Sequence, residues 1–388
     1  MKKQKVLFVL QSLRAGGSAS SLVNLVEELK NADLDVKVFL MEKEGMYLER
    51  CEKSVNVLQE ELLISSVVCD RKKLKDKCLF SFLIRILYSL ITKVANENKV
   101  NNWIYKRSAK KLQGFDVVIA FQEELVTEYS QYIECKKRIA WCHTAFDKFV
   151  HNRSISLMKK IYSKYDNVVC VSEVSKVSMI KNLDIELNKI QVIHNVLSID
   201  HIKSRSELSD NIPIKDSEYV FVSMGRMVPV KRFDRIIDAS VNLRHDNMDF
   251  KWYVIGDGEK KEELKHLACK KNISEMVIFV GQQENPYPWI KNADLFIMTS
   301  ESEAQPMSIN EALILGIPIV TTDFPSSREV VLDGYNGLIV SNNATGVYKG
   351  IKEYIENKSL QKKLSDGAKE FTYDNKRIVN KIGELIDA

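Results

Sequence analysis

The sequence predicts an α/β protein with two doubly wound domains, and three observations support this. Short apolar runs alternate with amphipathic segments, the pattern of parallel strands joined by helical crossovers. The pattern begins at residue 5, stops at a polar stretch over 203–217 and begins again at Tyr219. A chain of 388 residues also exceeds the size of an ordinary single core. We therefore expect domains over 1–200 and 201–372, with a C-terminal helix over about 373–388 packed back on the first domain.

Each expected strand is a short apolar run. The strands of the first half are 5–13, 36–41, 115–121, 138–141 and 167–171, and the first helix is 18–30. The second half repeats the scheme with strands 219–225, 250–255, 277–280, 295–299 and 319–322 and helices 233–244, 259–271, 288–292 and 308–315. Ligands of open parallel sheets bind beyond the carboxyl ends of the strands, so the residues that follow each strand are the candidates for function.

The bulk composition excludes several classes of protein. With 45% hydrophobic and 28% charged residues, the chain is typical of globular domains and not of disordered ones. Seven cysteines, an odd number without a CxxC pair, argue against a disulfide framework or a zinc site and favour a reducing cytoplasm. The N-terminal residues run directly into the first strand without an isolated apolar core and cleavage site, so no signal peptide is expected.

The segment 71–111 is strongly basic. It carries twelve lysines and arginines against only Asp76 and Glu97, a net charge of +10 in a chain whose total is +5. Its apolar run 78–92, interrupted by Arg85, is too short to span a bilayer, but such a helix can lie in the membrane interface. An ordinary core helix with a basic flank is the open alternative. The segment lacks a recognisable nucleic-acid-binding module, so we expect no nucleic-acid partner and consider peripheral contact with the inner face of a membrane instead.

Two glycine turns are candidates for phosphate binding. Gly16 and Gly17 follow the first strand and precede a helix, where a glycine backbone and a helix N-terminus can approach an anion, although many such turns are structural. In the second domain, Gly256-Asp257-Gly258 begins a dinucleotide-binding fingerprint, but Lys261 stands where its third glycine belongs. The incomplete fingerprint argues against a dehydrogenase.

The turn 225–234 places cations between a strand and a helix N-terminus. Arg226 and Lys231, with Arg232 as a third cation, suit a diphosphate, because arginine grips oxygens in a fork and lysine adds a point charge. Gly225 ends the strand before them. A solvated basic turn is the alternative, although its place beyond a strand's carboxyl end favours a ligand.

Two carboxylates follow the expected strand 295–299. Glu303 lies in the loop after that strand, and Glu311 lies eight residues later, about one turn inside the next helix. A carboxylate accepts hydrogen bonds from sugar and ribose hydroxyls, and the backbone N–H groups between the two can meet sugar or phosphate oxygens. Two carboxylates would also fit the acid and base of a hydrolase.

The first domain offers two further candidates. His143 follows the strand 138–141 and is either a structural histidine or a residue that faces the ligand. Glu123 follows the strand 115–121 and is either an acceptor-binding residue or half of a surface carboxylate pair with Glu124.

Taken in order, these motifs resemble one family. The set comprises Gly225-Arg226, Lys231, Phe233-Asp234, Gly256-Asp257-Gly258, Glu303, Glu311-Ala312, Gly316, Pro318, Asp333-Gly334 and Gly337. It is similar to the large family 4 of retaining glycosyltransferases, which have the GT-B fold of two Rossmann-like domains facing a central cleft. The resemblance covers essentially the whole chain, and residues 139–200 most resemble bacterial enzymes of capsule, O-antigen or exopolysaccharide synthesis.

The resemblance implies a role for each candidate. Gly17, with Gly16 beside it, would approach the phosphates of a nucleotide-sugar donor, and Arg226 and Lys231 would neutralise the diphosphate. Glu303 would hydrogen-bond the transferred sugar, Glu311 would hydrogen-bond the ribose, and His143 would contact the sugar near the reacting centre. Backbone amides near the sugar and phosphate would come from the segment Ala304, Gln305, Pro306, Met307 and Ser308.

The resemblance also implies the reaction. A hexosyl or N-acetylhexosaminyl unit would pass with retention from a UDP-linked donor to a glycan acceptor, which would be lipid-linked if residues 71–111 dock on a membrane. No cofactor or metal is expected, because the cations take its place and the only DxD sequence, Asp33-Leu34-Asp35, precedes a strand. Many members have Gly-Phe-Gly after the first glutamate, whereas this chain has Ala304-Gln305-Pro306, which narrows backbone freedom beside the sugar. The alternatives are a nucleotide-sugar 2-epimerase of the same fold and a noncatalytic partner subunit.

Overall fold

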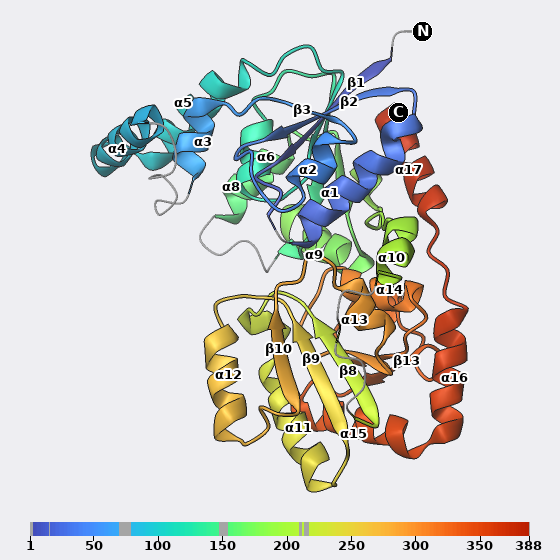
Figure 1. Ribbon diagram of the computed structural model, residues 1–388. Helices are drawn as coiled ribbons and strands as arrows, with labels where there is room; N and C mark the ends of the chain where they lie inside the picture. Colours follow the sequence, from blue (N-terminus) through green and yellow to red (C-terminus); the bar gives the residue numbers. More distant parts are fainter. Residues whose placement is uncertain are drawn as a thin grey trace. The chain divides into compact units, whose positions relative to one another are not determined.

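The computed structural model describes residues 3–14, 16–69, 79–146, 154–208, 212 and 217–387. The chain divides into two compact units, one formed by Met1–Val196 together with Asn375–Ala388 and the other by Leu197–Asp374. The division thus falls slightly before the boundary expected at residue 200. Each unit has one parallel sheet with helices around it (Figure 1), so the predicted α/β class with two doubly wound, Rossmann-like domains is confirmed.

The first unit is built on seven parallel strands in the order β3-β2-β1-β4-β5-β6-β7. The strands are β1 (Gln4–Leu10), β2 (Leu34–Leu40), β3 (Asn56–Val57), β4 (Val117–Ala120), β5 (Lys137–Cys142), β6 (Asn167–Cys170) and β7 (Ile190–Val192). The helices are α1 (Gly17–Glu28), α2 (Leu48–Glu52), α3 (Leu62–Val68), α4 (Leu79–Val94), α5 (Glu97–Ala109), α6 (Leu125–Ser130), α8 (Ile155–Tyr162), α9 (Glu173–Leu183) and α17 (Asn375–Asp387). The strand order reverses between β1 and β4, which is where sheets of this kind bind ligands.

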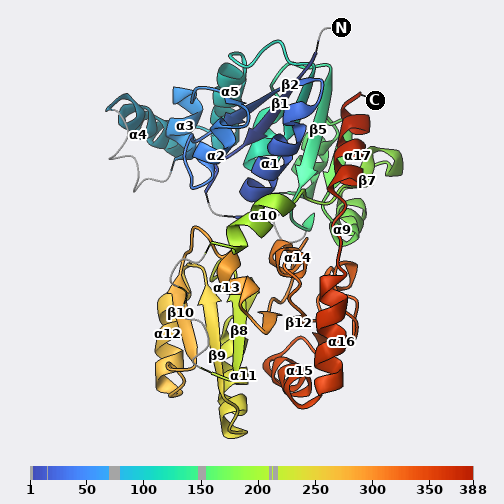
Figure 2. The same cartoon turned by 45° about the vertical axis from the view of Figure 1, so that its right-hand side comes forward.

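The C-terminal helix α17 belongs to the first unit, although the whole second unit precedes it in the chain (Figure 2). It lies at the amino ends of the strands. Gln4 Nε2 donates a hydrogen bond to the carbonyl of Ile386 at 3.2 Å, and Lys137 Nζ donates one to the carbonyl of Leu385 at 2.5 Å. Helix α17 therefore lies against the amino ends of β1 and β5, whereas the candidate residues follow the carboxyl ends of the strands.

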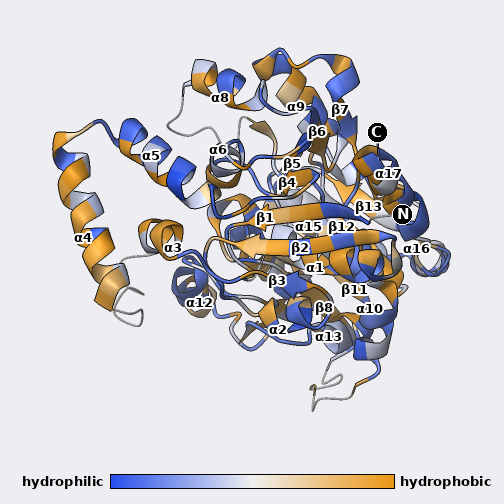
Figure 3. Ribbon diagram, turned by 90° about the horizontal axis from the view of Figure 1, so that it is seen from above, coloured by the Kyte–Doolittle hydropathy of each residue, from blue (hydrophilic) through white to orange (hydrophobic). Residues whose placement is uncertain are grey.

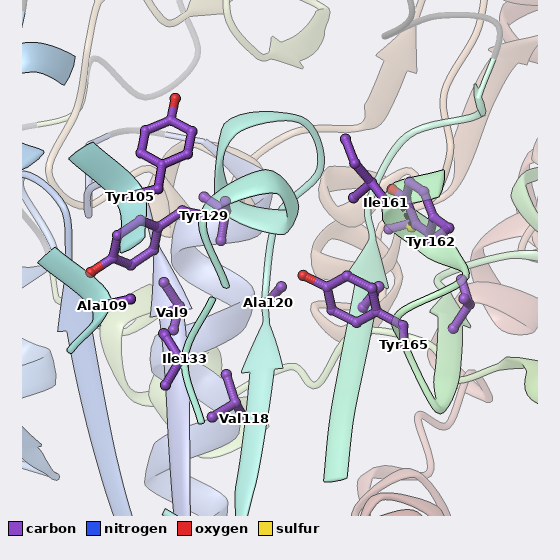
Figure 4. Packing of buried hydrophobic residues seen from close by; sticks show 14 of the residues in the cluster. Val9, Tyr105, Ala109, Val118, Ala120, Tyr129, Ile133, Ile161, Tyr162 and Tyr165 are labelled. Atoms are coloured by element: carbon purple, nitrogen blue, oxygen red, sulfur yellow. Dashed lines mark hydrogen bonds between the residues drawn. The ribbon is translucent and has the colours of Figure 1, made fainter. Parts of the chain in front are cut away.

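Buried tyrosines pack in the core between the helices and the sheet of the first unit (Figure 4). The rings of Tyr105 in α5 and Tyr129 in α6 meet edge to face, with centroids 5.9 Å apart, and the Tyr129 hydroxyl shares a 3.0 Å hydrogen bond with Ser108. Tyr165 donates to the carbonyl of Thr127 at 2.6 Å. Tyr129 and Tyr165 bury their apolar rings while their hydroxyls stay hydrogen-bonded. Helix α5, fixed in this way, lies next to α4, whose ribbon is largely hydrophobic in Figure 3.

The second unit has six parallel strands in the order β10-β9-β8-β11-β12-β13. The strands are β8 (Tyr219–Met224), β9 (Phe250–Ile255), β10 (Val277–Gly281), β11 (Leu295–Met298), β12 (Ile319–Thr322) and β13 (Gly337–Val340). The helices are α10 (Ile199–Ser206), α11 (Asp234–His245), α12 (Lys261–Lys270), α13 (Tyr287–Lys291), α14 (Met307–Ile314), α15 (Ala344–Glu356) and α16 (Lys358–Lys369). Here the strand order reverses between β8 and β11.

Both faces of the second sheet are covered by helices. Successive residues of one strand join different apolar clusters: Phe221 joins the cluster with α11, α12 and α15, whereas Val222 joins the cluster with α13 and α14. A strand buried on both faces has no polar side. This explains the continuous apolar runs by which the strands were predicted.

Candidate active site

The turn after β8 and the loop after β11 meet at the point where the strand order of the second unit reverses. The Glu301 amide donates a hydrogen bond to the carbonyl of Val230 at 2.8 Å. The Thr299 hydroxyl donates one to the carbonyl of Lys231 at 3.0 Å. These bonds join the two segments that the sequence singled out for their cations and carboxylates.

Lys231 and Glu303 form an ion pair at this junction. Lys231 Nζ lies 2.5 Å from Glu303 Oε1, and the Ser300 hydroxyl donates to the same oxygen at 2.6 Å. The two side chains are only 23% and 13% exposed. Ser326 holds the loop from the other side by donating to the Glu303 carbonyl at 2.8 Å. The lysine keeps further N–H donors for a ligand, because one ammonium group has three.

The three cations in the turn differ in their partners: Lys231 pairs with one carboxylate and Arg232 with two. Arg232 forms ion pairs with Asp234 and Glu301, which raise its pKa. Arg226, in contrast, is exposed, and its guanidinium makes no hydrogen bond or ion pair with any residue that the structure describes. Arg226 and Lys231 are therefore the cations placed for an anionic ligand. The predicted third cation, Arg232, has a structural role instead.

The glycines near this turn differ in whether packing leaves room for a side chain. A Cβ on Gly256 would lie 2.0 Å from the Gly225 carbonyl oxygen, and one on Gly258 would lie 2.5 Å from the Met227 carbonyl oxygen. These two glycines let the loop after β9 lie against the turn after β8, which explains the partial dinucleotide fingerprint without a dinucleotide. At Gly225 an added Cβ would meet only ordinary contacts, with the nearest atom, of Phe233, at 3.7 Å.

Helix α14 presents Glu311 and an uncapped N-terminus. Burial raises the pKa of the Glu311 carboxyl to about 8, and this side chain makes no hydrogen bond with a described residue. No side chain caps the first turn, whose N-cap is Pro306, and the Ser308 amide makes no hydrogen bond with a described residue, so it is available to a ligand. Pro306 itself has no N–H, and Gln305 is held by a 3.0 Å hydrogen bond from its side chain to the Tyr373 hydroxyl. The Met307 amide donates to the Gln305 carbonyl at 3.0 Å, so of the expected amide donors those of Ala304 and Ser308 are left without an acceptor among the described residues.

The N-terminus of α1 occupies the corresponding place in the first unit, beyond the carboxyl end of β1. A Cβ on Gly16 or Gly17 would meet no atom within 4 Å, so neither glycine is required by packing. Helix α1 has no side-chain cap and no acidic residue in its first turn. An anion can therefore approach this backbone closely.

Glu123 and His143 lie next to each other, because β4 and β5 are neighbouring strands. Burial raises the pKa of Glu123 to about 7, although the nearby His143 and Thr144 amides favour its ionised form. Glu123 is only 7% exposed, which removes the interpretation as a surface pair with Glu124. Its Oε1 has no hydrogen-bond partner among the described residues.

His143 has both ring nitrogens buried without a hydrogen-bond partner in the described part of the chain. Burial lowers its pKa to about 3, which the Phe121 carbonyl, near the ring but outside hydrogen-bond geometry, opposes only weakly. The imidazole is thus neutral at physiological pH. It can offer one donor and one acceptor to a ligand, but no positive charge.

The described residues contain no group of three or more histidine, cysteine, aspartate or glutamate side chains that could hold a metal ion. None of their helices has the length and hydropathy needed to cross a membrane. Asp33 and Asp35 lie at the amino end of β2, as the sequence predicted.

Comparison with known proteins assigns a family to both halves. Residues 15–201 match the model of "Glycosyltransferase Family 4", and residues 204–371 match that of "Glycosyl transferases group 1". The N-acetylgalactosamine-N,N'-diacetylbacillosaminyl-diphospho-undecaprenol 4-alpha-N-acetylgalactosaminyltransferase of Campylobacter jejuni is 27% identical over 59% of this chain and 62% of its own length. A poly(ribitol-phosphate) alpha-N-acetylglucosaminyltransferase of Staphylococcus aureus is 25% identical over 54% of this chain and 40% of its own. The matches thus span less than two thirds of these relatives.

Solved structures agree on the fold. HepE from Anabaena in complex with UDP-glucose aligns with a TM-score of 0.77 at 16% identity, over 99% of both chains. S. aureus TarM aligns with a TM-score of 0.74 at 16% identity, also over 99% of both chains. At this identity the likeness concerns the fold alone. With the two family models following one another along the sequence, this chain belongs to the family 4, group 1 glycosyltransferases.

Proposed function

We propose that this protein is a retaining glycosyltransferase that moves a hexosyl or N-acetylhexosaminyl unit from a UDP-linked donor to a lipid-linked glycan acceptor in surface polysaccharide synthesis. The observation that carries the proposal is the Lys231–Glu303 pair beside the unpaired Arg226. Two cations for a diphosphate and one carboxylate for sugar hydroxyls lie beyond adjacent strands of the second unit, where open α/β sheets bind nucleotides.

The proposed chemistry is electrostatic. When the bond between the sugar and the diphosphate breaks, negative charge grows on the leaving diphosphate. Arg226 and the free N–H donors of Lys231 stabilise that charge, and the uncapped first turn of α14 adds oriented amide dipoles. Glu303 holds the sugar through its hydroxyls, and the acceptor oxygen attacks on the face that the diphosphate leaves. The diphosphate takes up the acceptor's proton, so no side chain is needed as the base.

In the first unit, we propose that Gly17 approaches the donor phosphates and that His143 contacts the sugar. A neutral imidazole suits a sugar hydroxyl, which can both donate and accept a hydrogen bond. We further propose that Glu123, beside it, binds an acceptor hydroxyl; its Oε1 has no hydrogen-bond partner among the described residues.

The names of relatives favour this donor and acceptor. The C. jejuni relative is named for a saccharide linked to diphospho-undecaprenol, and HepE has been solved with UDP and with UDP-glucose. These names motivate UDP as the first nucleotide to test and a polyprenyl-diphosphate saccharide as the first acceptor.

The first test is a thermal-shift experiment without added metal. UDP and UDP-sugars are expected to raise the Tm, and GDP and ADP are not, because a ligand of the folded state stabilises it by mass action. EDTA is expected to leave the shift unchanged if Arg226 and Lys231 replace a metal. Absence of a shift with every nucleotide would favour the noncatalytic subunit, and loss of the shift in EDTA would contradict metal independence.

Glu311 gives a prediction about pH. With a pKa of about 8 the carboxyl is mostly protonated at pH 7, and two ribose hydroxyls that donate to it would favour the ionised form. UDP binding at pH 7 is therefore expected to release a proton from Glu311, whereas at pH 9 the group is already ionised and releases none. Calorimetry in buffers of different ionisation enthalpy measures this release. Glu311→Gln is the control that separates this proton from the ionisation of UDP, and equal release by the wild type and the variant would contradict the assignment.

A further inference from the structure

Helix α4 turns its polar side toward the protein and its apolar side outward, the reverse of an ordinary surface helix. Its polar residues face the protein: Ser81 is buried, and Arg85, Tyr88 and Thr92 are partly buried. At 100° per residue these positions fall on one side of the helix. The opposite side consists of large apolar residues, which are Leu79, Phe80, Phe82, Leu83, Ile86, Leu87, Leu90, Ile91 and Val94, each exposed by between 42% and 92%.

Specific bonds hold α4 in this orientation. Arg85 donates a hydrogen bond to the carbonyl of Val67 in α3, and its guanidinium lies over the Tyr88 ring. The Tyr88 hydroxyl in turn bonds Glu97 at 3.1 Å and Asn101 at 3.0 Å, both in α5. Ile84 and Tyr88 also pack against the core of the first unit. Rotation of α4 to bury its apolar side would break these contacts, so the apolar side is stably presented outward.

An exposed apolar face of this size needs a partner, since contiguous patches on isolated proteins are rarely so large. Sixteen residues of helix are too few to cross a bilayer, but they suit a helix that lies in the plane of the interface. The charge of the surrounding sequence identifies the partner: the segment 71–111 has a net charge of +10. Of its cations, Lys93, Lys99, Lys106 and Lys110 lie in or directly after α4 and α5, whereas 71–78 lie outside the described residues.

The protein-facing side of α4 closes a groove of about 550 Å³. The α4 wall consists of Arg85, Tyr88, Ser89, Thr92 and Lys93. The far end reaches Gln11, directly after β1, and Leu125 at the start of α6, which follows β4. The groove therefore runs from α4 to the carboxyl ends of the two strands between which the strand order of this sheet reverses.

We propose that the apolar face of α4 inserts into an anionic lipid surface and that the groove behind it admits the polar head of a lipid-linked acceptor. Insertion would bury the apolar side chains among acyl chains, while the lysines of α4 and α5 meet the anionic head groups. The docking follows from α4 alone; only the identity of the groove's occupant rests on the glycosyl-transfer function proposed above.

The test is flotation of the full chain with phosphatidylcholine vesicles that contain or lack phosphatidylglycerol. The wild type is expected to float with the anionic vesicles and to float less as salt screens the lysines. Leu87→Glu with Leu90→Glu should weaken partitioning by about a hundredfold or more, because two leucines no longer transfer into the apolar phase. The matched control is Val177→Glu with Leu187→Glu, two apolar residues of the same unit that are 62% and 70% exposed, and this variant should float like the wild type.

Two outcomes would overturn docking: no flotation of the wild type with anionic vesicles, or equal loss in both double variants. A wild-type dimer that L87E/L90E converts to a monomer, without flotation, would assign the face to a second copy of this chain. The Tm shift by UDP is read on the same samples. An unchanged shift in L87E/L90E shows that the fold and the donor site of this variant are intact. If the wild type floats but UDP does not shift its Tm, membrane docking is supported and the proposed activity is contradicted.

The groove is tested with Ser89→Trp, which adds a large side chain to the α4 wall of the groove and leaves every residue of the apolar face unchanged. The probe is transfer from a UDP-sugar to a polyprenyl-diphosphate-linked N-acetylhexosamine in anionic vesicles, using the UDP-sugar that gives the largest thermal shift. Transfer is expected to fall at least tenfold while flotation and the UDP shift remain as in the wild type. Undiminished transfer in this variant would overturn the acceptor role of the groove.

Discussion

Replacing Lys231 with alanine is expected to lower kcat/KM for glycosyl transfer by about a hundredfold to a thousandfold, the usual effect of removing one preorganised donor to developing charge. The ammonium lies at the carboxyl edge of β8 and β11, where the donor diphosphate is proposed to leave. Glu303 keeps its hydrogen bond from Ser300 in the variant, so the fold should persist. Steady-state kinetics with the nucleotide chosen by thermal shift measures the loss, and the Tm of the free variant reports on folding.

Lys261 provides a close control for this substitution. It lies in the same unit, its side chain is 22% exposed against 23% for Lys231, and it too forms an ion pair, with Asp257 at 2.6 Å. Lys261→Ala should keep kcat/KM within a few-fold of the wild type. This result would show that the loss in Lys231→Ala comes from the position of Lys231 and not from the removal of an ion-paired lysine as such. Near-normal activity of Lys231→Ala would remove the central assignment of the proposed function.

Glu303→Gln is expected to lower kcat/KM by about tenfold to a hundredfold, the range for losing a hydrogen bond to a charged group. Glutamine keeps the size of the side chain and can still accept from Ser300, but it loses the charge that attracts Lys231 and strengthens hydrogen bonds from sugar hydroxyls. The same kinetic assay measures this, with product anomers read by NMR to establish whether the linkage is retained.

The neighbouring carboxylate supplies the comparison. Glu301 lies in the same loop, is 55% exposed on its side chain and pairs with Arg232 on the protein surface. Glu301→Gln should change kcat/KM little, since screened surface pairs contribute weakly. Equal losses in the two variants would indicate that the loop's stability, and not a contact of Glu303 with the sugar, is being measured.

Most of the fold could be predicted because parallel strands buried on both faces leave an unmistakable apolar pattern. The strands that were missed are β3, β7 and β13, which have two, three and four residues. The runs of β3 and β7 are too short to show a periodicity, and all three strands lie at an edge of their sheet, where each forms by pairing with a single neighbour. β1 also ends at Leu10, earlier than its apolar run suggested, because pairing with β2 stops there.

Composition and spacing were enough to predict the α/β class, the two units, the candidate cations and carboxylates, and the basic charge of 71–111, because these features can be read directly from the order of the residues. The folded structure was needed to show that Lys231 pairs with Glu303, that Arg232 pairs with Asp234 and Glu301, and that the polar side of α4 faces inward. The same holds for the burial that leaves His143 neutral and raises the pKa values of Glu123 and Glu311. Ion pairing, burial and helix orientation depend on which residues distant in the chain come to lie together, and spacing along one chain does not carry that information.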